Sequence, residues 1–150
     1  MSNIVLYTDG ACKGNPGIGG WGAILRYKAH EKVISGAEMQ TTNNRMELTA
    51  VIQGLAALKE PCVVDLYTDS KYVQNGCETW MHRWVKNQWR GSDKALIKNQ
   101  DLWLQLYNLY NIHSIKIFWV KGHSGDLMND RADALANQAI LDLLAQKQGD

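Results

Sequence analysis

Two copies of one four-residue stretch place carboxylates at the ends of two predicted strands. Residues 6–9 read Leu-Tyr-Thr-Asp, and residues 66–69 repeat the same four residues. Each copy closes an apolar run of the kind that forms a β-strand, so parallel pairing would bring Asp9 and Asp69 together at one sheet edge. Neighbouring carboxylates repel each other unless a proton or a cation lies between them. An all-oxygen site suits a hard divalent cation, Mg²⁺ or Mn²⁺.

Two further acids are predicted to reach the same edge from helices. Glu47 lies in the first turn of a predicted helix that runs to about residue 59, and Asp133 lies in an early turn of the last predicted helix. Each shares a helical face with apolar or small residues, and that face should pack on the sheet. Each also has an ordinary structural interpretation: Glu47 can form a capping box with Asn44, and Asp133 can favour the helix dipole.

The four acids taken together favour catalysis over structure. Asp9 and Asp69 could each be a turn-forming aspartate when considered alone. Four carboxylates at one edge, however, would destabilise the fold unless cations offset their repulsion. Two metal ions about 3.5–4 Å apart stabilise the attacking and leaving oxygens of a phosphoryl displacement, so the cluster predicts a two-metal site. His123, in a glycine-hinged loop before the last helix, is a candidate proton shuttle or product-release residue, although a lone loop histidine is commonly only solvated.

A basic, aromatic segment at about residues 80–99 is a second candidate site. The segment contains five basic residues and one acidic residue, and tryptophans alternate with the basic residues. The residues are Arg83, Lys86, Arg90, Lys94 and Lys98, with Trp80, Trp84, Trp89 and the nearby Trp103. One interpretation is an amphipathic helix with an aromatic inner face. The other is an arm that follows a nucleic-acid backbone with salt-dependent affinity and stacks on its sugars or bases.

Strands and helices predicted from periodicity place these residues in one α/β fold. Strands are predicted at 3–8, 21–27, 32–39, 63–67 and 115–120, and helices at about 45–59, 71–77, 80–89, 101–110 and 129–144. The first three strands are joined by short loops and should be antiparallel, whereas the later ones are separated by helices and should be parallel. The glycine-rich stretch 10–20 joins two strands and lacks Gly-Lys-Ser/Thr, so it predicts a tight hairpin. The result is a mixed five-stranded sheet flanked by helices.

Composition indicates one globular domain over residues 1–150. Hydrophobic residues make up 45 % of the chain and charged residues 21 %, and the net charge is only +1. No apolar run approaches the ~20 residues of a membrane span, and no signal-peptide pattern is present, so we expect a cytoplasmic protein without a membrane partner. Three cysteines without a CxxC pair indicate free thiols. Nothing in the sequence requires self-association, and we expect a monomer.

Several motifs, spread in order along the chain, carry a family resemblance. They are Asp9-Gly10, Gly14-Asn15-Pro16-Gly17, Thr-Asn-Asn-Arg-Met-Glu-Leu at 42–48, Thr68-Asp69-Ser70, and Lys121-Gly122-His123 followed by Asn129 and Asp133. This set resembles the motifs of type 1 ribonuclease H in its bacterial ribonuclease HI form. The resemblance implies a ribonuclease H-like fold and endonucleolytic cleavage of the RNA strand of RNA–DNA hybrids, with 5′-phosphate and 3′-hydroxyl ends.

The same resemblance implies roles for individual residues. It implies metal binding by Asp9, Glu47, Asp69 and Asp133, with two Mg²⁺ ions or Mn²⁺ as a substitute, and proton transfer or product release by His123. It implies hybrid contacts, in a minor groove where 2′-hydroxyls mark RNA, by Asn15, Asn43 and Asn44. A DNA phosphate would be held by Thr42 and Asn99, and the DNA-strand channel would be lined by Trp80 and Trp84. Arg90 is a further predicted substrate contact from the basic arm.

The chain departs from the family pattern at a few positions. The arm after Trp84 is less basic than in the best-known members, which predicts weaker or more salt-sensitive binding. Lys71 and Gln40 lie near the expected substrate where other residue types are frequent, and Asp126 adds an acid near His123.

Two alternative functions use only part of this residue set. A DNA-cutting relative of the same fold, such as a junction resolvase or transposase core, would need the four acids but neither the three asparagines nor the arm. A non-catalytic hybrid-binding module would not need the acids, so their complete presence argues against it.

Overall fold

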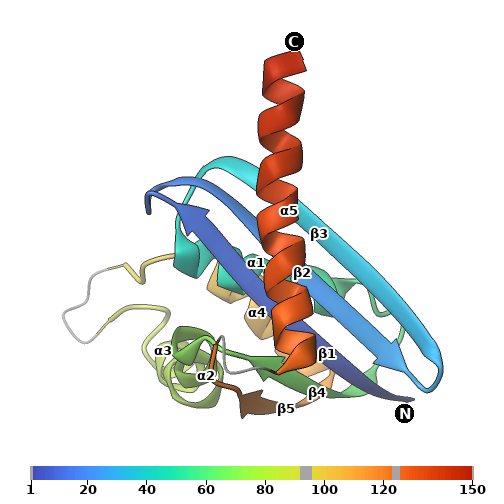
Figure 1. Cartoon of the computed structure of the whole chain (residues 1–150). Coiled ribbons are helices and arrows are strands. Elements are labelled where there is room, and N and C mark those ends of the chain that lie inside the picture. The colour runs from blue at the N-terminus through green and yellow to red at the C-terminus, as the bar shows by residue number, and fades with distance from the viewer. Residues whose placement is uncertain (1, 92–95, 123–125, 150) are drawn as a thin grey trace.

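A single mixed sheet of five strands forms the centre of the molecule (Figure 1). The computed structural model describes residues 2–91, 96–122 and 126–149. The strands lie in the order β3-β2-β1-β4-β5. Their bounds are β1 (Ser2–Lys13), β2 (Gly17–Tyr27), β3 (His30–Thr41), β4 (Cys62–Thr68) and β5 (Ser114–Trp119). β1, β2 and β3 pair antiparallel, and β4 pairs parallel with both β1 and β5, which confirms the predicted sheet.

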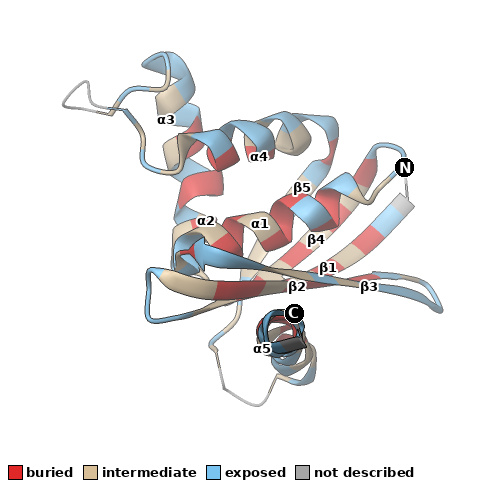
Figure 2. Ribbon diagram, turned by 90° about the horizontal axis from the view of Figure 1, so that it is seen from above, coloured by how far each residue is buried: buried red, intermediate tan, exposed pale blue. Residues whose placement is uncertain are grey.

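Helices cover both faces of this sheet (Figure 2). They are α1 (Asn43–Ala56), α2 (Lys71–Asn75), the π-helical turn η1 (Gly76–Trp80), α3 (Met81–Lys86), α4 (Gln100–Ile112) and α5 (Leu127–Gly149). α1 lies on one face, with α2, α3 and α4 on its side, and α5 crosses the other face against β1, β2 and β3. Among the described helices, none is both long and apolar enough to cross a membrane.

The main core lies between α1, α4 and the sheet. Its side chains alternate along the strands, so that Leu6 and Leu66 face inward while Tyr7 and Tyr67 face the other side. Trp103 of α4 is fully buried in this core. By the same alternation Asp9 has the phase of Tyr7, whereas Gly10 has the phase of Leu6 and faces α1.

The two Leu-Tyr-Thr-Asp copies pair residue for residue, with Leu6 opposite Leu66 and Tyr7 opposite Tyr67. Pairing between β1 and β4 ends there, two residues before each aspartate. The expectation that both strands end at this point is wrong for β1, which continues to Lys13 because β2 still supplies hydrogen-bond partners. The strands therefore separate where Asp9 and Asp69 lie, and the space between them is open to other elements.

Residues 10–20 form less of a loop than predicted. The hairpin is confirmed, but β1 and β2 absorb most of the stretch and leave residues 14–16 as the turn. Gly14 has a φ of +80°, which glycine adopts without strain. Gly20 serves close packing instead, since a Cβ there would lie 2.2 Å from the carbonyl oxygen of Ala136 in α5. Glycine in this strand therefore lets α5 approach the sheet.

The predicted helix at 80–89 is wrong in its bounds. Helical structure runs through η1 and α3 and ends at Lys86. Gln88 and Trp89 then adopt φ values of 55° and 62°, so the chain leaves the helix before the last tryptophan of the segment. The final helix, α5, is longer than predicted: it continues to Gly149, whereas the predicted helix ends at residue 144.

Candidate active site and nucleic-acid interface

β1 and α1 bring Asp9 and Glu47 together around one backbone amide. The N–H of Gly10 donates to Asp9 Oδ1 at 2.9 Å and to Glu47 Oε1 at 2.7 Å. Each of the two acidic residues is only 4 % exposed. The close crossing depends on glycine, because a Cβ at position 10 would lie 2.5 Å from the backbone nitrogen of Glu47.

The capping-box interpretation of Glu47 is wrong. The N-cap of α1 is Thr42, whose Oγ1 accepts a hydrogen bond from the Arg45 backbone N–H at 3.3 Å. Glu47 is five residues beyond this cap, whereas a capping box needs the acid at the third position. Its carboxylate is therefore free to face the sheet, where it meets Gly10.

Asp69 joins the pair from the end of β4. One carboxylate oxygen from each of Asp9, Glu47 and Asp69 lies within 4.8 Å of the others. The turn after Asp69 is fixed locally, since Ser70 Oγ accepts from the Val73 backbone N–H at 3.1 Å and thereby caps α2. This trio confirms the predicted meeting of the two strand-end aspartates and the helix glutamate.

Asp133 lines the same cleft, from α5, outside the close trio. Asn137, one turn further along the helix, donates from Nδ2 to the Asp133 carbonyl oxygen at 2.9 Å and to its Oδ1 at 3.3 Å. Asn137 also lines the cleft. Asn137 was not among the predicted site residues, although its spacing of four residues from Asp133 places both on one helical face.

Burial and like charge raise the pKa values in this cluster. Burial raises the pKa of Asp9 far above its ordinary value, and the charges of Glu47 and Asp69 raise it further. Burial is also the main cause that raises the pKa of Glu47. Without a cation, the cluster therefore retains a proton near neutral pH.

The trio fits a divalent cation. Glu47 Oε2 is buried and has no hydrogen-bond partner among the described residues. An orphaned carboxylate oxygen beside two other carboxylates is a set of hard oxygen donors, which suits Mg²⁺ or Mn²⁺ better than softer metals. The cluster can thus hold a metal ion whose charge offsets its repulsion.

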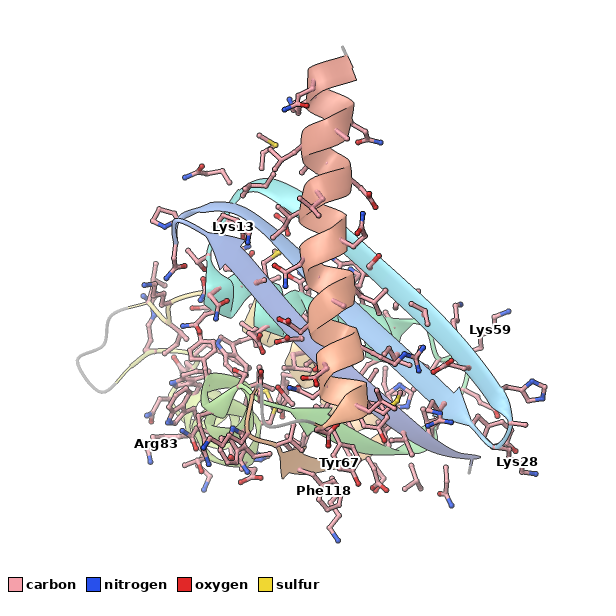
Figure 3. All side chains as sticks on the ribbon, viewed as in Figure 1. Lys13, Lys28, Lys59, Tyr67, Arg83 and Phe118 are labelled. Carbon is pink, nitrogen blue, oxygen red and sulfur yellow. The ribbon has the colours of Figure 1, made fainter. Side chains whose placement is uncertain are left out.

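The acids line an open cleft with a volume of about 700 Å³. Among its described lining residues, the cations are Lys13 and Lys71. Figure 3 shows Lys13 and Arg83 toward one side of the molecule and Lys28 and Lys59 toward the other. The cleft therefore carries charges of both signs.

A smaller pocket of about 290 Å³ adjoins the cleft at the N-terminus of α1. It gathers five predicted substrate residues with one lysine: Asn15, Thr42, Asn43, Asn44, Asn99 and Lys98. Two of them, Asn43 and Asn44, also line the acidic cleft. The turn of the β1–β2 hairpin is tied to α1 here, because the Asn43 backbone N–H donates to Asn15 Oδ1 at 2.8 Å.

Hydrogen bonds that the sequence did not predict hold Asn99 in this pocket. Asn99 Oδ1 accepts from Arg45 Nη1 at 3.2 Å, and its Nδ2 donates to the Tyr72 hydroxyl at 3.2 Å. Trp103 Nε1 donates to the same hydroxyl at 2.9 Å, and Arg45 forms a two-pronged ion pair with Asp101. Asp101 and Trp103 share α4 with Asn99, its N-cap, but Arg45 comes from α1 and Tyr72 from α2, so no sequence spacing links these two to Asn99.

The tryptophans of the arm pack inward. Ring centroids are 5.4 Å apart for Trp84 and Trp103, 6.0 Å for Trp80 and Trp84, and 6.1 Å for Trp84 and Trp89. This arrangement bears out the aromatic inner face, while Trp80 and Trp84 remain half-exposed. Arg90 is exposed, and the nucleic-acid-binding interpretation of the segment stays a prediction.

Two predicted residues, His123 and Lys94, lie outside the described residues. The chain just before His123 passes beside the acids, since a Cβ on Gly122 would lie 2.8 Å from Asp69 Oδ2. The role predicted for His123 stays a prediction.

A four-acid cleft beside amide-rich and aromatic surfaces, on a mixed sheet with helices on both faces, defines a metal-dependent nuclease of the ribonuclease H class. The family model for RNase H matches residues 1–141. The Ribonuclease H of Legionella pneumophila (strain Corby) is 61 % identical over 140 residues, which cover 93 % of this chain and 98 % of that protein.

Solved structures agree with this match. LC9-RNase H1, a type 1 RNase H with the type 2 active-site motif, is 31 % identical with a TM-score of 0.85, over 93 % of this chain and 72 % of that chain. LC11-RNase H1, solved in complex with an RNA/DNA hybrid, shares the fold at 22 % identity and a TM-score of 0.65, over 94 % and 99 % of the two chains. The chain belongs to the RNase H family, in its type 1 bacterial form.

Proposed function

We propose that this protein is an endonuclease that hydrolyses the RNA strand of RNA–DNA hybrids with two divalent ions, leaving 5′-phosphate and 3′-hydroxyl ends. The observation that carries the proposal is the adjacency of the four-acid cleft and the asparagine-rich pocket, which share Asn43 and Asn44. One region suits a metal-dependent phosphodiester reaction, and the other suits recognition of a nucleic-acid duplex.

The metal ligands in this proposal are Asp9, Glu47, Asp69 and Asp133. When bound, a pair of Mg²⁺ or Mn²⁺ ions supplies charge stabilisation and a water of lowered pKa. The chain's own groups orient the ligands: the Gly10 N–H fixes one oxygen each of Asp9 and Glu47. Asn137 restrains Asp133 in the same way that outer hydrogen bonds restrain metal ligands generally. His123 would transfer a proton or help the product leave.

The RNA/DNA hybrid that LC11-RNase H1 binds is the substrate class we infer for this chain. Asn15, Asn43 and Asn44 carry amides that both donate and accept, and this matches a 2′-hydroxyl, which also does both. Thr42 and Asn99 lie in the smaller pocket with Lys98, a combination suited to a DNA phosphate.

The arm would bind the DNA strand. The half-exposed edges of Trp80 and Trp84 offer a surface for sugars and bases, and the exposed Arg90 offers charge to the backbone. We further propose that the chain forms one domain that acts as a monomer in the cytoplasm. The three cysteines are free, which suits a reducing compartment.

The test compares three end-labelled substrates: an RNA–DNA hybrid, duplex DNA and duplex RNA. Each is incubated with the protein in Mg²⁺, in Mn²⁺ and in EDTA. We expect metal-dependent cutting of the RNA in the hybrid alone. Cutting of duplex DNA would favour a resolvase-like enzyme, and hybrid binding without cleavage in either metal would favour a binding module.

A further inference from the structure

Lys71 is a cation in the acidic cleft that no step above uses. It is the first residue of α2, two residues after Asp69, and it lines the cleft with the four acids. The ion pairs among the described residues are Arg45 with Asp101 and Arg131 with Glu31, so Lys71 has no carboxylate partner there.

The Lys71 ammonium rests instead on an aromatic ring. Its Nζ lies 4.0 Å from the centroid of the Trp119 ring, and 3.5 Å from Gln74 Oε1. Trp119 is held in place because its Nε1 donates to the Asp69 carbonyl oxygen at 3.0 Å. This hydrogen bond holds the indole ring beside the acids, at the point where β4 and β5 end.

The contact with the Trp119 ring leaves the charge of Lys71 available to bind an anion. A cation–π contact at an exposed site is weak and does not neutralise the ammonium, unlike a carboxylate partner. Lysine carries its charge on a flexible stem with three donors, so it can leave the ring for a stronger acceptor without a change in the backbone. A phosphate oxygen is such an acceptor, because hydrogen bonds between charged groups are the strong ones.

We propose that Lys71 binds a phosphate of the RNA strand next to the one that is cut, moving from the Trp119 ring to do so. The inference rests on the proposed function, since it assumes that the RNA backbone lies in the cleft with the four acids. Lys71 then adds affinity without reading sequence, because phosphate contacts position a duplex and base contacts specify it. The positive charge of Lys71 would partly compensate for the small number of basic residues in the arm.

A matched control lies on β5. Lys116 Nζ is 5.6 Å from the centroid of the Phe118 ring, so it makes the same kind of contact. Lys116 does not line the cleft. Lys116→Gln therefore removes one exposed lysine and one cation–π contact without touching the proposed phosphate site.

The first experiment measures the dissociation constant of a hybrid in EDTA, where metal-dependent cleavage cannot proceed, from about 50 to 200 mM salt. For Lys71→Gln we expect affinity to fall about 3- to 10-fold at low salt, which corresponds to about 0.6–1.4 kcal/mol. We expect the slope of log K against log salt to shrink by about 0.7–0.9, the value for one lost phosphate contact. Lys116→Gln should keep the wild-type slope. If the slope of log K against log salt for Lys71→Gln equalled that of the wild type, the inference would be overturned, whether or not the variant had a lower Tm.

A second experiment identifies the phosphate. Single uncharged methylphosphonate linkages are placed in turn along the RNA strand, and binding is compared for wild type and Lys71→Gln. At one linkage near the cut, the two changes should be non-additive, because both remove the same contact. Additivity at every RNA linkage would also overturn the inference. A wild-type protein that neither binds nor cuts the hybrid would reject the proposed function itself, which distinguishes the two failures.

Discussion

The acidic cleft and the tryptophan arm contribute to stability with opposite signs. In the cleft, Asp9 and Glu47 are buried beside each other, and burial raises both pKa values. Like charges held together out of water destabilise the metal-free fold. In the arm, Trp84 contacts Trp80, Trp89 and Trp103, so the side chains proposed to face the DNA strand also extend the core.

The two regions also differ in how they are built. Three of the acids lie on the long elements β1, α1 and α5, and Asp69 directly follows β4. Glycines let those elements cross closely. The part of the arm up to residue 91 contains short helical pieces and a turn with two left-handed residues, Gln88 and Trp89. Substitutions of the acids in the cleft should therefore separate activity from stability, whereas substitutions of the arm tryptophans should lower both.

Asp9→Asn should have the largest effect. We expect cleavage of the hybrid to fall by more than about 10³-fold, because losing several kcal/mol of charge stabilisation has that consequence. We expect the Tm in EDTA at pH 8 to rise, because asparagine is neutral without the proton uptake that the buried Asp9 carboxyl needs at this pH. Cleavage rates and thermal unfolding of the same preparation test both halves.

Asp65→Asn is the matched control for Asp9→Asn. Asp65 lies on β4 with the same strand phase as Asp69, but it does not line the cleft. It should leave cleavage nearly unchanged. An Asp9→Asn protein that cleaves at the wild-type rate would show that this carboxylate is not a metal ligand.

The stability of the metal-free protein should fall as pH rises. The folded-state pKa values of Asp9 and Glu47 are raised, so between pH 5 and 9 the folded state holds protons that the unfolded chain has lost. Stability is then greatest at the acidic end of that window and decreases with pH, by on the order of 2–5 kcal/mol in total. Urea unfolding in EDTA at several pH values measures this decrease.

Two changes should flatten that pH dependence. Asp9→Asn removes one of the coupled groups, and saturating Mg²⁺ stabilises the ionised cluster. If the wild-type unfolding free energy in EDTA rose between pH 5 and 9, the assignment of a destabilising buried pair would be incorrect.

Trp84→Ala should show the opposite sign of stability change. Truncating a tryptophan that touches three others leaves a cavity and should lower the unfolding free energy by about 2–4 kcal/mol. Hybrid affinity should fall as well. Val85→Ala, at an exposed neighbouring site, should change stability by less than about 0.5–1 kcal/mol. A Trp84→Ala protein as stable as wild type would show that the arm does not extend the core.

The sequence was sufficient for the sheet and for the convergence of the acids because both depend on local periodicity. The repeated Leu-Tyr-Thr-Asp stretch predicts parallel pairing, and Leu6 and Leu66 do pair. The helix that carries Glu47 follows from spacing, although its N-cap is Thr42 and not Asn44. Patterns that repeat every two or every 3.6 residues survive folding because each strand and helix buries one face.

Contacts between separate elements could not be predicted in this way. The Gly10 amide that joins Asp9 to Glu47 depends on how α1 crosses β1. The pairing of Asn99 with Tyr72 depends on the left-handed start of α4. The arm helix ends at Lys86, before two left-handed residues, Gln88 and Trp89, which local helix propensity does not predict.

Arg90→Ala should have the smallest effect of these substitutions. Arg90 is exposed and contributes charge without belonging to the aromatic cluster, so a substitution there separates the proposed binding role of the arm from its structural role. We expect KM for the hybrid to rise a few-fold, most at high salt, with kcat and Tm nearly unchanged. Lys59→Ala removes a cation on the other side of the molecule (Figure 3) and should leave KM unchanged. An Arg90→Ala enzyme with wild-type KM at every salt concentration would confine the arm to a structural role, and the cleft alone would then have to account for hybrid affinity.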